Sequence, residues 1–519
     1  MRTCGQALAS QGAPVYGSSA AETHAPRLSR MPSDTSTTGG GFVSYDSPRG
    51  RGVLLASVLG SGMAFLDSTA VNVALPALGR ELHTGLAGLQ WAVDAYLLTL
   101  GSLVLTGGAL GDAWGQRRVF LMGMVAFTAL SVLCGLAPNA WTLALFRAGQ
   151  GMGAAMLVPA SLALLRTSFP EADRQRAVAA WAGLSGVTTA LGPLLGGWLV
   201  DVGSWRWVFF LNVPMAALAG WAALRHVPDD RPTGDARRLD VAGSVTAALG
   251  LGGVIYALIE GPARGWTTVS ILAAVGGAML LAAFLFIEAR ARNPMLPLGL
   301  FRSRTFSGAN LTTLAVYFAL GGVSFLLVLA LQQQLGYSAL AAGASLLPIT
   351  LLLLVLSPWV GRLAGRIGAR PLMTLGPLLA GVGMALLTRL QKDGSYVGTV
   401  LPGVLVLGLG LSLTVGPLTA VVLGAVEDRH AGIASGVNNA VARIAGLLAV
   451  ALLPLLGGLS NKTGEAFLTG TREALWVSAG LCVLGALCSY VLLPKDVGRV
   501  EQGPTRRAGP PRLKRPAHA

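Results

Sequence analysis

Fourteen apolar runs, each long enough to cross a lipid bilayer, constrain this 519-residue chain more than any other feature. They lie within residues 53–493, and the connections between them are short. A helix of about 20 apolar residues spans a hydrocarbon core of roughly 30 Å and satisfies its own backbone hydrogen bonds there. Hydrophobic residues make up 53% of the chain and charged residues only 12%, too apolar a composition for a soluble core. We therefore expect an all-α integral membrane protein.

Basic residues are divided unequally between the two sides of the predicted spans. Of the 38 Lys and Arg residues, 29 lie in the two tails and in every second connection, whereas 7 lie in the remaining connections. Because positively charged segments stay in the cytoplasm, we expect both termini to be cytoplasmic. The strong preference for Arg over Lys suggests a high-GC bacterial genome, so the expected location is the bacterial plasma membrane. This sorting also accounts for the net charge of +15 without a nucleic-acid partner.

The N-terminal tail is rich in Gly, Ser, Thr and Pro and has no apolar signal-peptide core, so we expect it to be disordered. Met31 is an alternative start within it. The expected organisation has five segments: a disordered cytoplasmic tail (1–50), a six-helix bundle (51–225), two inserted helices (239–290), a second six-helix bundle (305–494) and a basic cytoplasmic tail (495–519).

Two sequence patterns recur eight spans apart. A Gly-rich pattern ending in Arg occupies residues 108–117 and again residues 361–370. The sequence Pro-Leu-Leu-Gly-Gly occupies residues 193–197 and again residues 454–458. Two six-helix halves related by a parallel repeat, with two helices inserted between them, give this offset, and such repeats are typical of transporters.

An ordered set of motifs resembles the major facilitator superfamily, specifically its fourteen-helix drug/proton antiporter group. The motifs occupy residues 66–76, 91–96, 108–118, 145–151, 186–197, 205–214, 293–298 and 434–439. The resemblance implies a proton-coupled secondary transporter that exports small amphipathic compounds. It also implies a monomer in the lipid bilayer, with the proton gradient as its energy source and no cofactor.

Three ionisable residues in the spans are the predicted proton-coupling and substrate residues: Asp67, Asp94 and Arg147. They lie at similar depth in the outer half of the membrane, where an ionisable residue costs about 2.5–3.5 kcal/mol and usually marks a pathway or proton relay. No His lies well inside a span, so proton chemistry there requires carboxylates. We expect Asp67 to face a cavity and to attract Arg147 when it is ionised.

Three further sets of residues follow from the motifs. The predicted cytoplasmic gate has Ala113 and Gln116 where the family motif carries basic residues, which implies a weaker gate. Arg443 has an open role, either in backbone packing or in a cavity. The sets are the gate motif (Gly108, Asp112, Gly115, Arg117, Arg118), the antiporter helix motif (Gly192, Pro193, Gly196, Gly197) and a possible cavity set (Arg443, Asn438, Asn439).

Other functions fit the sequence less well. An uptake symporter or an exporter of an endogenous metabolite on the same fold is the nearest alternative. A membrane-embedded enzyme or a lipid flippase would need a nucleophile or metal cluster, and no span holds one, so we expect neither an enzyme nor a metal site. No Gly-Lys pair exists, so a nucleotide-binding P-loop is excluded. A sensor is disfavoured because no soluble output domain fits between the spans.

The charge asymmetry predicts the topology. Reporter enzymes that are active only outside the cytoplasm should be inactive when fused to either end of the chain, and a cytoplasmic reporter should be active at both. Opposite signals from the two ends would contradict an even number of spans.

Overall fold

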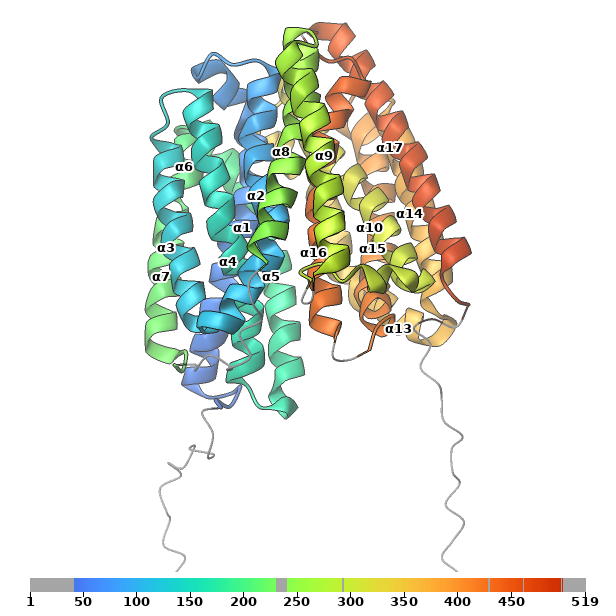
Figure 1. Ribbon diagram of the computed structural model, residues 1–519. Helices are drawn as coiled ribbons and strands as arrows, with labels where there is room; N and C mark the ends of the chain where they lie inside the picture. The colour runs from blue at the N-terminus through green and yellow to red at the C-terminus, as the bar shows by residue number, and fades with distance from the viewer. Residues whose placement is uncertain are drawn as a thin grey trace, which may run out of the picture. The chain divides into compact units, whose positions relative to one another are not determined.

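The computed structural model describes most of the chain, and the described part is helical. Fourteen of its helical segments are long and apolar enough to cross a membrane, which confirms the predicted number. They run side by side as a single bundle of rods (Figure 1). The described residues are 42–229, 240–291, 294–427, 430–460, 462–495 and 497.

The first six spans form the N-terminal half. Polar residues at their starts cap the free backbone N–H groups, as Ser47 does for Gly50 and Asn139 does for Thr142. The helices are α1 (Pro48–Glu81), α2 (Leu86–Trp114), α3 (Gln116–Gly135), α4 (Ala140–Ser168), α5 (Glu171–Val202), α6 (Arg206–Phe210) and α7 (Asn212–His226), the last two sharing one span.

The described part of the chain begins before residue 50, the predicted end of the disordered N-terminal tail. Helix α1 already begins at Pro48, and the backbone N–H of Val43 donates to the carbonyl of Ser168 at 2.8 Å. The side chain of Asp173 accepts a hydrogen bond from the N–H of Tyr45 at 3.0 Å. These contacts anchor the segment before α1 to the end of α4 and the start of α5. The rest of the predicted tail, residues 1–41, lies outside the described residues, as does nearly all of the C-terminal tail.

Two inserted spans and six further spans complete the chain. The inserted helices are α8 (Val241–Arg264) and α9 (Thr268–Arg290), and α8 packs against α2 of the N-terminal half and α16 of the C-terminal half. The C-terminal half holds the short 3₁₀ turn η1 (Leu298–Arg302), α10 (Arg304–Gly322), the π-helical turn η2 (Val323–Leu327), α11 (Val328–Gln333), α12 (Ala339–Ala344), α13 (Leu347–Ile367), α14 (Ala369–Leu387), the π-helical turn η3 (Tyr396–Val400), α15 (Leu401–Gly424), α16 (Ala431–Leu456) and α17 (Gly464–Leu492).

Helix packing repeats between the two halves, as the sequence patterns predict. Helix α2 packs on α4 as α13 packs on α15, and α1 packs on α5 and α7 as α10 packs on α16 and α17. The repeated Gly-rich pattern ends a helix at Gly115 (φ 92°) and at Gly368 (φ 87°). Both φ values lie in the region that favours glycine. In each turn the glycine is the single residue between one helix and the next. The sequence repeat is therefore also a structural repeat.

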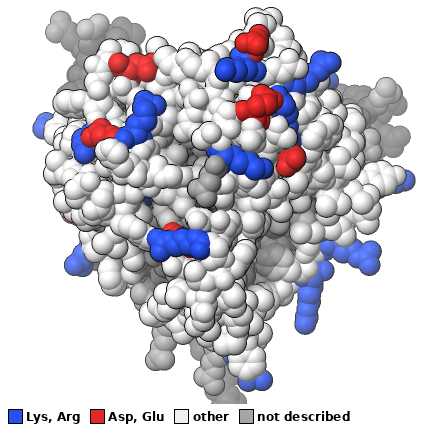
Figure 2. All heavy atoms as spheres, turned by 90° about the horizontal axis from the view of Figure 1, so that it is seen from above, with Lys and Arg blue, Asp and Glu red and all other residues white. Residues whose placement is uncertain are grey.

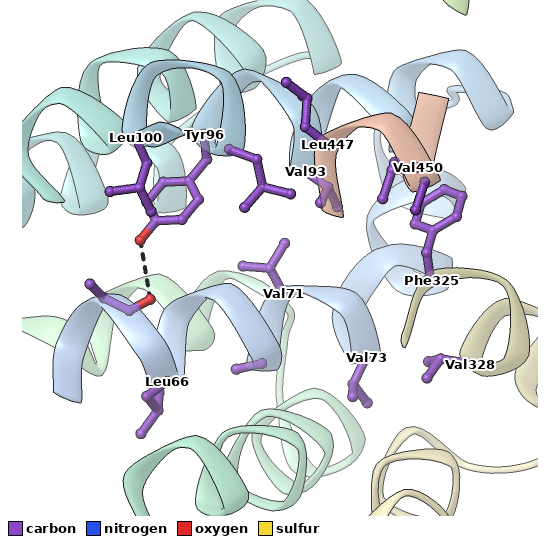
Figure 3. Packing of buried hydrophobic residues seen from close by; sticks show 14 of the residues in the cluster. Leu66, Val71, Val73, Val93, Tyr96, Leu100, Phe325, Val328, Leu447 and Val450 are labelled. Atoms are coloured by element: carbon purple, nitrogen blue, oxygen red, sulfur yellow. Dashed lines mark hydrogen bonds between the residues drawn. The ribbon is translucent and has the colours of Figure 1, made fainter. Parts of the chain in front are cut away.

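The face where α1 begins and α17 ends is called the terminal face here, and the other end of the bundle is called the opposite face. Near the opposite face the two halves meet in a dry contact, the seal. Figure 3 shows side chains of α1, α2, η2, α11 and α16 packed together in it. All are at most 6% exposed, and they include Val71, Val73, Val93, Phe325, Val328, Leu447 and Val450.

Hydrogen bonds between the halves reinforce the seal. The side-chain amide of Gln90 donates to the carbonyl of Val450 at 2.8 Å, and that of Gln332 donates to the carbonyl of Val73 at 2.9 Å. The Asp201 carboxylate accepts from the backbone N–H groups of Ala339 and Leu340, both at 2.9 Å, at the start of α12. A carboxylate at a helix N-terminus is stabilised by the free N–H groups and the helix dipole.

The opposite face carries charges of both signs close to one another (Figure 2). Arg206 pairs with Glu81 at 3.1 Å, and Arg472 pairs with Glu465 at 2.9 Å. Exposed pairs of this kind stabilise a fold only slightly. This face consequently has little net charge, in keeping with the side that the basic residues avoid.

Helices α5 and α12 touch without intervening side chains at Gly197 and Gly343. A Cβ on Gly197 would lie 2.6 Å from the Cα of Leu340, and one on Gly343 would meet the carbonyl oxygen of Pro193. Because backbone atoms cannot rotate away as side chains do, a larger residue at either position would push the halves apart.

Gly197→Val should therefore open the seal. In a variant without native cysteines, a cysteine placed at Val73, which is 1% exposed, should react with a membrane-impermeant thiol reagent faster when Gly197→Val is present. Gly186→Val on the same helix is the matched control, because nothing lies within 4 Å of its Cβ position. Equal labelling in the two variants at equal protein abundance would show that the Gly197 contact does not hold the seal closed.

Candidate functional site

A cavity of about 320 Å³ opens at the terminal face between the two halves. Its wall is formed by α2, α4 and α5 on one side and α16 on the other, with Phe65 of α1 at its inner end. The charged residues of the wall, Asp112, Arg166 and Asp240, all lie at or near helix ends. The cavity is thus accessible from the terminal face, whereas the seal closes the route to the opposite face.

Asp67 and Arg147 form an ion pair inside the N-terminal half. Their side chains are 0% and 1% exposed, and Arg147 Nη1 lies 2.5 Å from Asp67 Oδ2. The other carboxylate oxygen accepts from the amides of Gln150 at 3.0 Å and Asn212 at 3.1 Å. Buried charges are tolerated when they are paired and hydrogen-bonded in this way. Asp67 thus connects α1 with α4 and α7.

Further contacts stabilise the buried charge of the Arg147 guanidinium. Its Nε donates to the carbonyl of Ala92 at 2.9 Å, and its Nη1 donates to Gln150 Oε1 at 2.8 Å. The ring of Tyr96 lies 4.2 Å from the guanidinium carbon, close enough for a cation–π interaction. Arg147 therefore links α4 to α2.

The expectation that Asp67 faces a cavity is wrong for this conformation. Asp67 is fully buried, and neither it nor Arg147 is among the residues that line the cavity. The predicted attraction between the two residues is present, but it is satisfied within one half of the protein. The physical reason is that the polar residues of α4 and α7 surround the carboxylate and remove it from solvent.

Asp94 on α2 has a different environment. It is also fully buried, but neither of its carboxyl oxygens has a hydrogen-bond partner in the described part of the chain. One turn earlier, Gln90 bonds to α16 and Trp91 donates to Glu260 of α8 at 2.9 Å. Because residues three and four apart share a helix face, Asp94 lies where α2 meets α8 and α16. It is therefore part of the seal.

The gate motif occupies the turn between α2 and α3. Gly115 makes the turn, and Gln116 donates to Asp112 at 2.9 Å. Arg117 pairs with Asp229, which follows α7. It also donates to the carbonyl of Leu224, near the end of α7, at 3.0 Å. These two contacts of Arg117 stay within the N-terminal half. Gly108 and Asp112 line the cavity, and Arg118 is exposed.

The small residues of the antiporter helix motif let α5 pack closely against α1 of its own half and against α12 of the other half. On one side, a Cβ on Gly192 would meet Thr69 and one on Gly196 would meet Ala70, both on α1. On the other side, Pro193 and Gly197 contact α12. Helix α5 nevertheless runs unbroken through Pro193. The small residues therefore act through close packing that closes the seal.

The three residues of the possible cavity set on α16 have different surroundings. Asn438 donates to Asn310 at 3.1 Å and to Thr313 at 2.7 Å, so it fastens α16 to α10 within the C-terminal half. Asn439 lines the cavity. Arg443 follows one turn later, with its guanidinium carbon 5.4 Å from the centre of the Phe65 ring.

Sequence reasoning missed four polar residues around the ion pair: Gln150, Asn212, Ser131 and Tyr96. Gln150, Tyr96 and Asn212 lie within motifs that were recognised, but no role was assigned to them. Gln150 follows Arg147 by three residues and so shares its helix face, a signal that the sequence contained. Ser131, which accepts from Asn212 at 2.9 Å, gave no signal because its span carries no other motif.

Known proteins resemble this chain over most of its length. A multidrug resistance protein of Mycobacterium tuberculosis is 39% identical over 437 residues, which is 82% of this chain and 76% of that protein. A puromycin resistance protein of Streptomyces alboniger is 35% identical, with coverage of 85% and 90%. A methylenomycin A resistance protein of Bacillus subtilis is 36% identical, with coverage of 88% and 98%.

Solved structures resemble the fold alone. A peptide-bound transporter of the POT family superposes with a TM-score of 0.65 at 14% identity, covering 86% of this chain and 96% of that one. A D-xylose–proton symporter superposes with a TM-score of 0.61 at 15% identity, with coverage of 86% and 99%. The family model of the Major Facilitator Superfamily matches residues 57–450. This chain, a membrane protein of fourteen spans, therefore belongs to the Major Facilitator Superfamily.

Proposed function

We propose that this protein exports small amphipathic molecules from a bacterial cell in exchange for protons. Its relatives named above are resistance proteins, which supports export rather than uptake. With both termini in the cytoplasm, the terminal face is cytoplasmic, and the cavity opens toward the cytoplasm. That is the conformation in which an exporter takes up its substrate. Both halves of the pathway lie in one chain, so a monomer in the lipid bilayer suffices.

The observation that carries the proton coupling is the unpartnered carboxyl of Asp94 in the seal. Neither Arg147 of α4 nor Arg443 of α16 forms an ion pair with it in the described part of the chain. An uncompensated charge in the middle of a membrane costs about 2.5–3.5 kcal/mol on insertion scales. The closed seal therefore favours the neutral acid, and the carboxylate favours an open seal in which water reaches it.

This preference gives an exchange cycle. When the seal is open, a proton from outside neutralises Asp94, and the seal closes around the neutral acid. The cavity then opens to the cytoplasm and binds its substrate. Release of the proton to the cytoplasm leaves a charge that destabilises the closed seal, so the protein reopens outward and the substrate leaves. Proton entry is thereby tied to substrate exit.

The Asp67–Arg147 pair transmits this change to the rest of the N-terminal half. Arg147 Nε donates to the carbonyl of Ala92, two residues before Asp94, so movement of α2 at the seal alters the coordination of the guanidinium. Protonation of Asp67 would weaken the same pair and loosen α1 from α4. In this proposal Asp94 responds to the state of the seal, and the ion pair couples α2 to α1 and α4.

Asp94→Asn should abolish proton-driven export, because an amide is neutral at every pH and cannot drive the seal open. In inverted vesicles, the wild-type protein should accumulate a fluorescent amphipathic dye when a proton gradient is imposed and stop when a protonophore is added. The variant should show no gradient-driven accumulation at equal abundance. Asp46→Asn, the same change in an exposed ion pair with Arg176 outside the cavity wall, should retain transport. Accumulation that persists with protonophore and depends on ATP would refute proton exchange.

Asp67→Asn should lower stability, because it leaves the Arg147 guanidinium buried without its counter-ion. Breaking a buried pair costs about 3–5 kcal/mol, and removing both charges restores part of that loss. The melting temperature of the purified protein should therefore fall in Asp67→Asn and recover in Asp67→Asn/Arg147→Met, while export stays lost in both. Asp94→Asn breaks no pair and should melt like the wild type. If Asp67→Asn transports normally, the pair has no part in coupling.

A further inference from the structure

Arg443 is a charged residue in the middle of α16 that the proton cycle does not use. It is half-buried, and it forms no ion pair or hydrogen bond with any described residue. Arg147 of the N-terminal half, by contrast, has a carboxylate, an amide and a carbonyl around it. One of the two predicted roles for Arg443 was packing against backbone carbonyls. No contact with a described residue supports that role.

The surroundings of Arg443 come from both halves. Its guanidinium stands over the ring of Phe65 on α1, and its Cβ lies next to Gly101 of α2, where an added Cβ would be 3.3 Å away. The cation thus lies between α1, α2 and α16, where the two halves meet.

Arg443 also lies beside the inner end of the cavity. Phe65, beneath its guanidinium, and Asn439, one helical turn before it, both line the cavity wall. The two carboxylates of that wall, Asp112 and Asp240, are at the rim, near the end of α2 and at the start of α8. No carboxylate lines the inner end among the described residues, so no acidic group of the cavity wall there offsets the charge of Arg443.

We propose that Arg443 binds the anionic group of the transported molecule, and that the preferred substrates are amphipathic carboxylates. A guanidinium donates two parallel hydrogen bonds to a carboxylate, and an arginine without a counter-ion inside a membrane gains most from such a ligand. The apolar part of the molecule would lie against Phe65 and the aliphatic wall residues Val104 and Leu105. This inference rests on the proposed export function and names its substrate class.

The test uses three probes with the same aromatic body and different charge: dansylglycine (anionic), dansylglycinamide (neutral) and dansylethylenediamine (cationic). Binding to the purified full-length protein in lipid nanodiscs is followed by dansyl fluorescence. We expect the wild type to bind the anionic probe at least tenfold more tightly than the cationic one. Arg443→Gln should remove this preference by weakening the anionic probe at least tenfold, with little change for the neutral one. Arg443→Lys should retain part of the preference.

Arg176→Gln is the matched control, because it removes an exposed positive charge at the terminal face, outside the cavity wall, and should leave the preference intact. Equal binding of the three probes to the wild type, absence of binding, or a preference for the cation would overturn the proposal, and these results need no variant to fold. An unchanged affinity of Arg443→Gln for the anionic probe would also overturn it. Failure of the export function would instead appear in vesicles, as binding of the anionic probe without proton-driven transport.

Discussion

A hydrocarbon environment gives an ionisable side chain three favourable arrangements: it can be paired, neutral, or placed at a water-filled cavity. Four such residues of this bundle adopt three different arrangements. Arg147 is paired with Asp67 inside the N-terminal half. Asp94 is buried without a hydrogen-bond partner among the described residues, which favours its neutral form. Arg443 lies beside Phe65, which lines the inner end of the cavity. The proposed mechanism follows from these three environments.

The seal turns the environment of Asp94 into a conformational preference. Its apolar side chains exclude water, and the backbone contacts at Gly197 and Gly343 bring the halves together without side chains that could adjust. Packed interfaces of this kind favour discrete open and closed states over gradual deformation. A single uncompensated charge inside such an interface is then large enough to shift the balance between the two states.

Much of this architecture follows from the sequence, because long apolar runs and basic loops obey strong constraints. The fourteen spans and the parallel repeat were predicted, and the two turns at Gly115 and Gly368 show the repeat at the level of single dihedral angles. The pairing of Asp67 with Arg147 was also expected, since both lie at similar depth.

Which side chains face a cavity could not be predicted, because that depends on contacts between helices far apart in sequence. Asp67 and Asp94 have similar depth and chemistry, yet Asn212 of α7 donates a hydrogen bond to the carboxyl of Asp67, whereas no described residue donates one to Asp94. Arg117 likewise donates to a carbonyl near the end of α7, a contact that the motif does not specify. Rotation of each helix about its axis decides these outcomes, and short motifs do not specify it.

The central claim is that the proton on Asp94 holds the seal closed. Spin labels at His83 and Thr463, on connections of the two halves at the opposite face, allow the distance between the halves to be measured by pulsed electron paramagnetic resonance as a function of pH. We expect a short distance at low pH and a growing population with a longer distance as the pH rises. A distance distribution that does not change with pH would contradict it, as would the same change in a protein that lacks the Asp94 carboxyl.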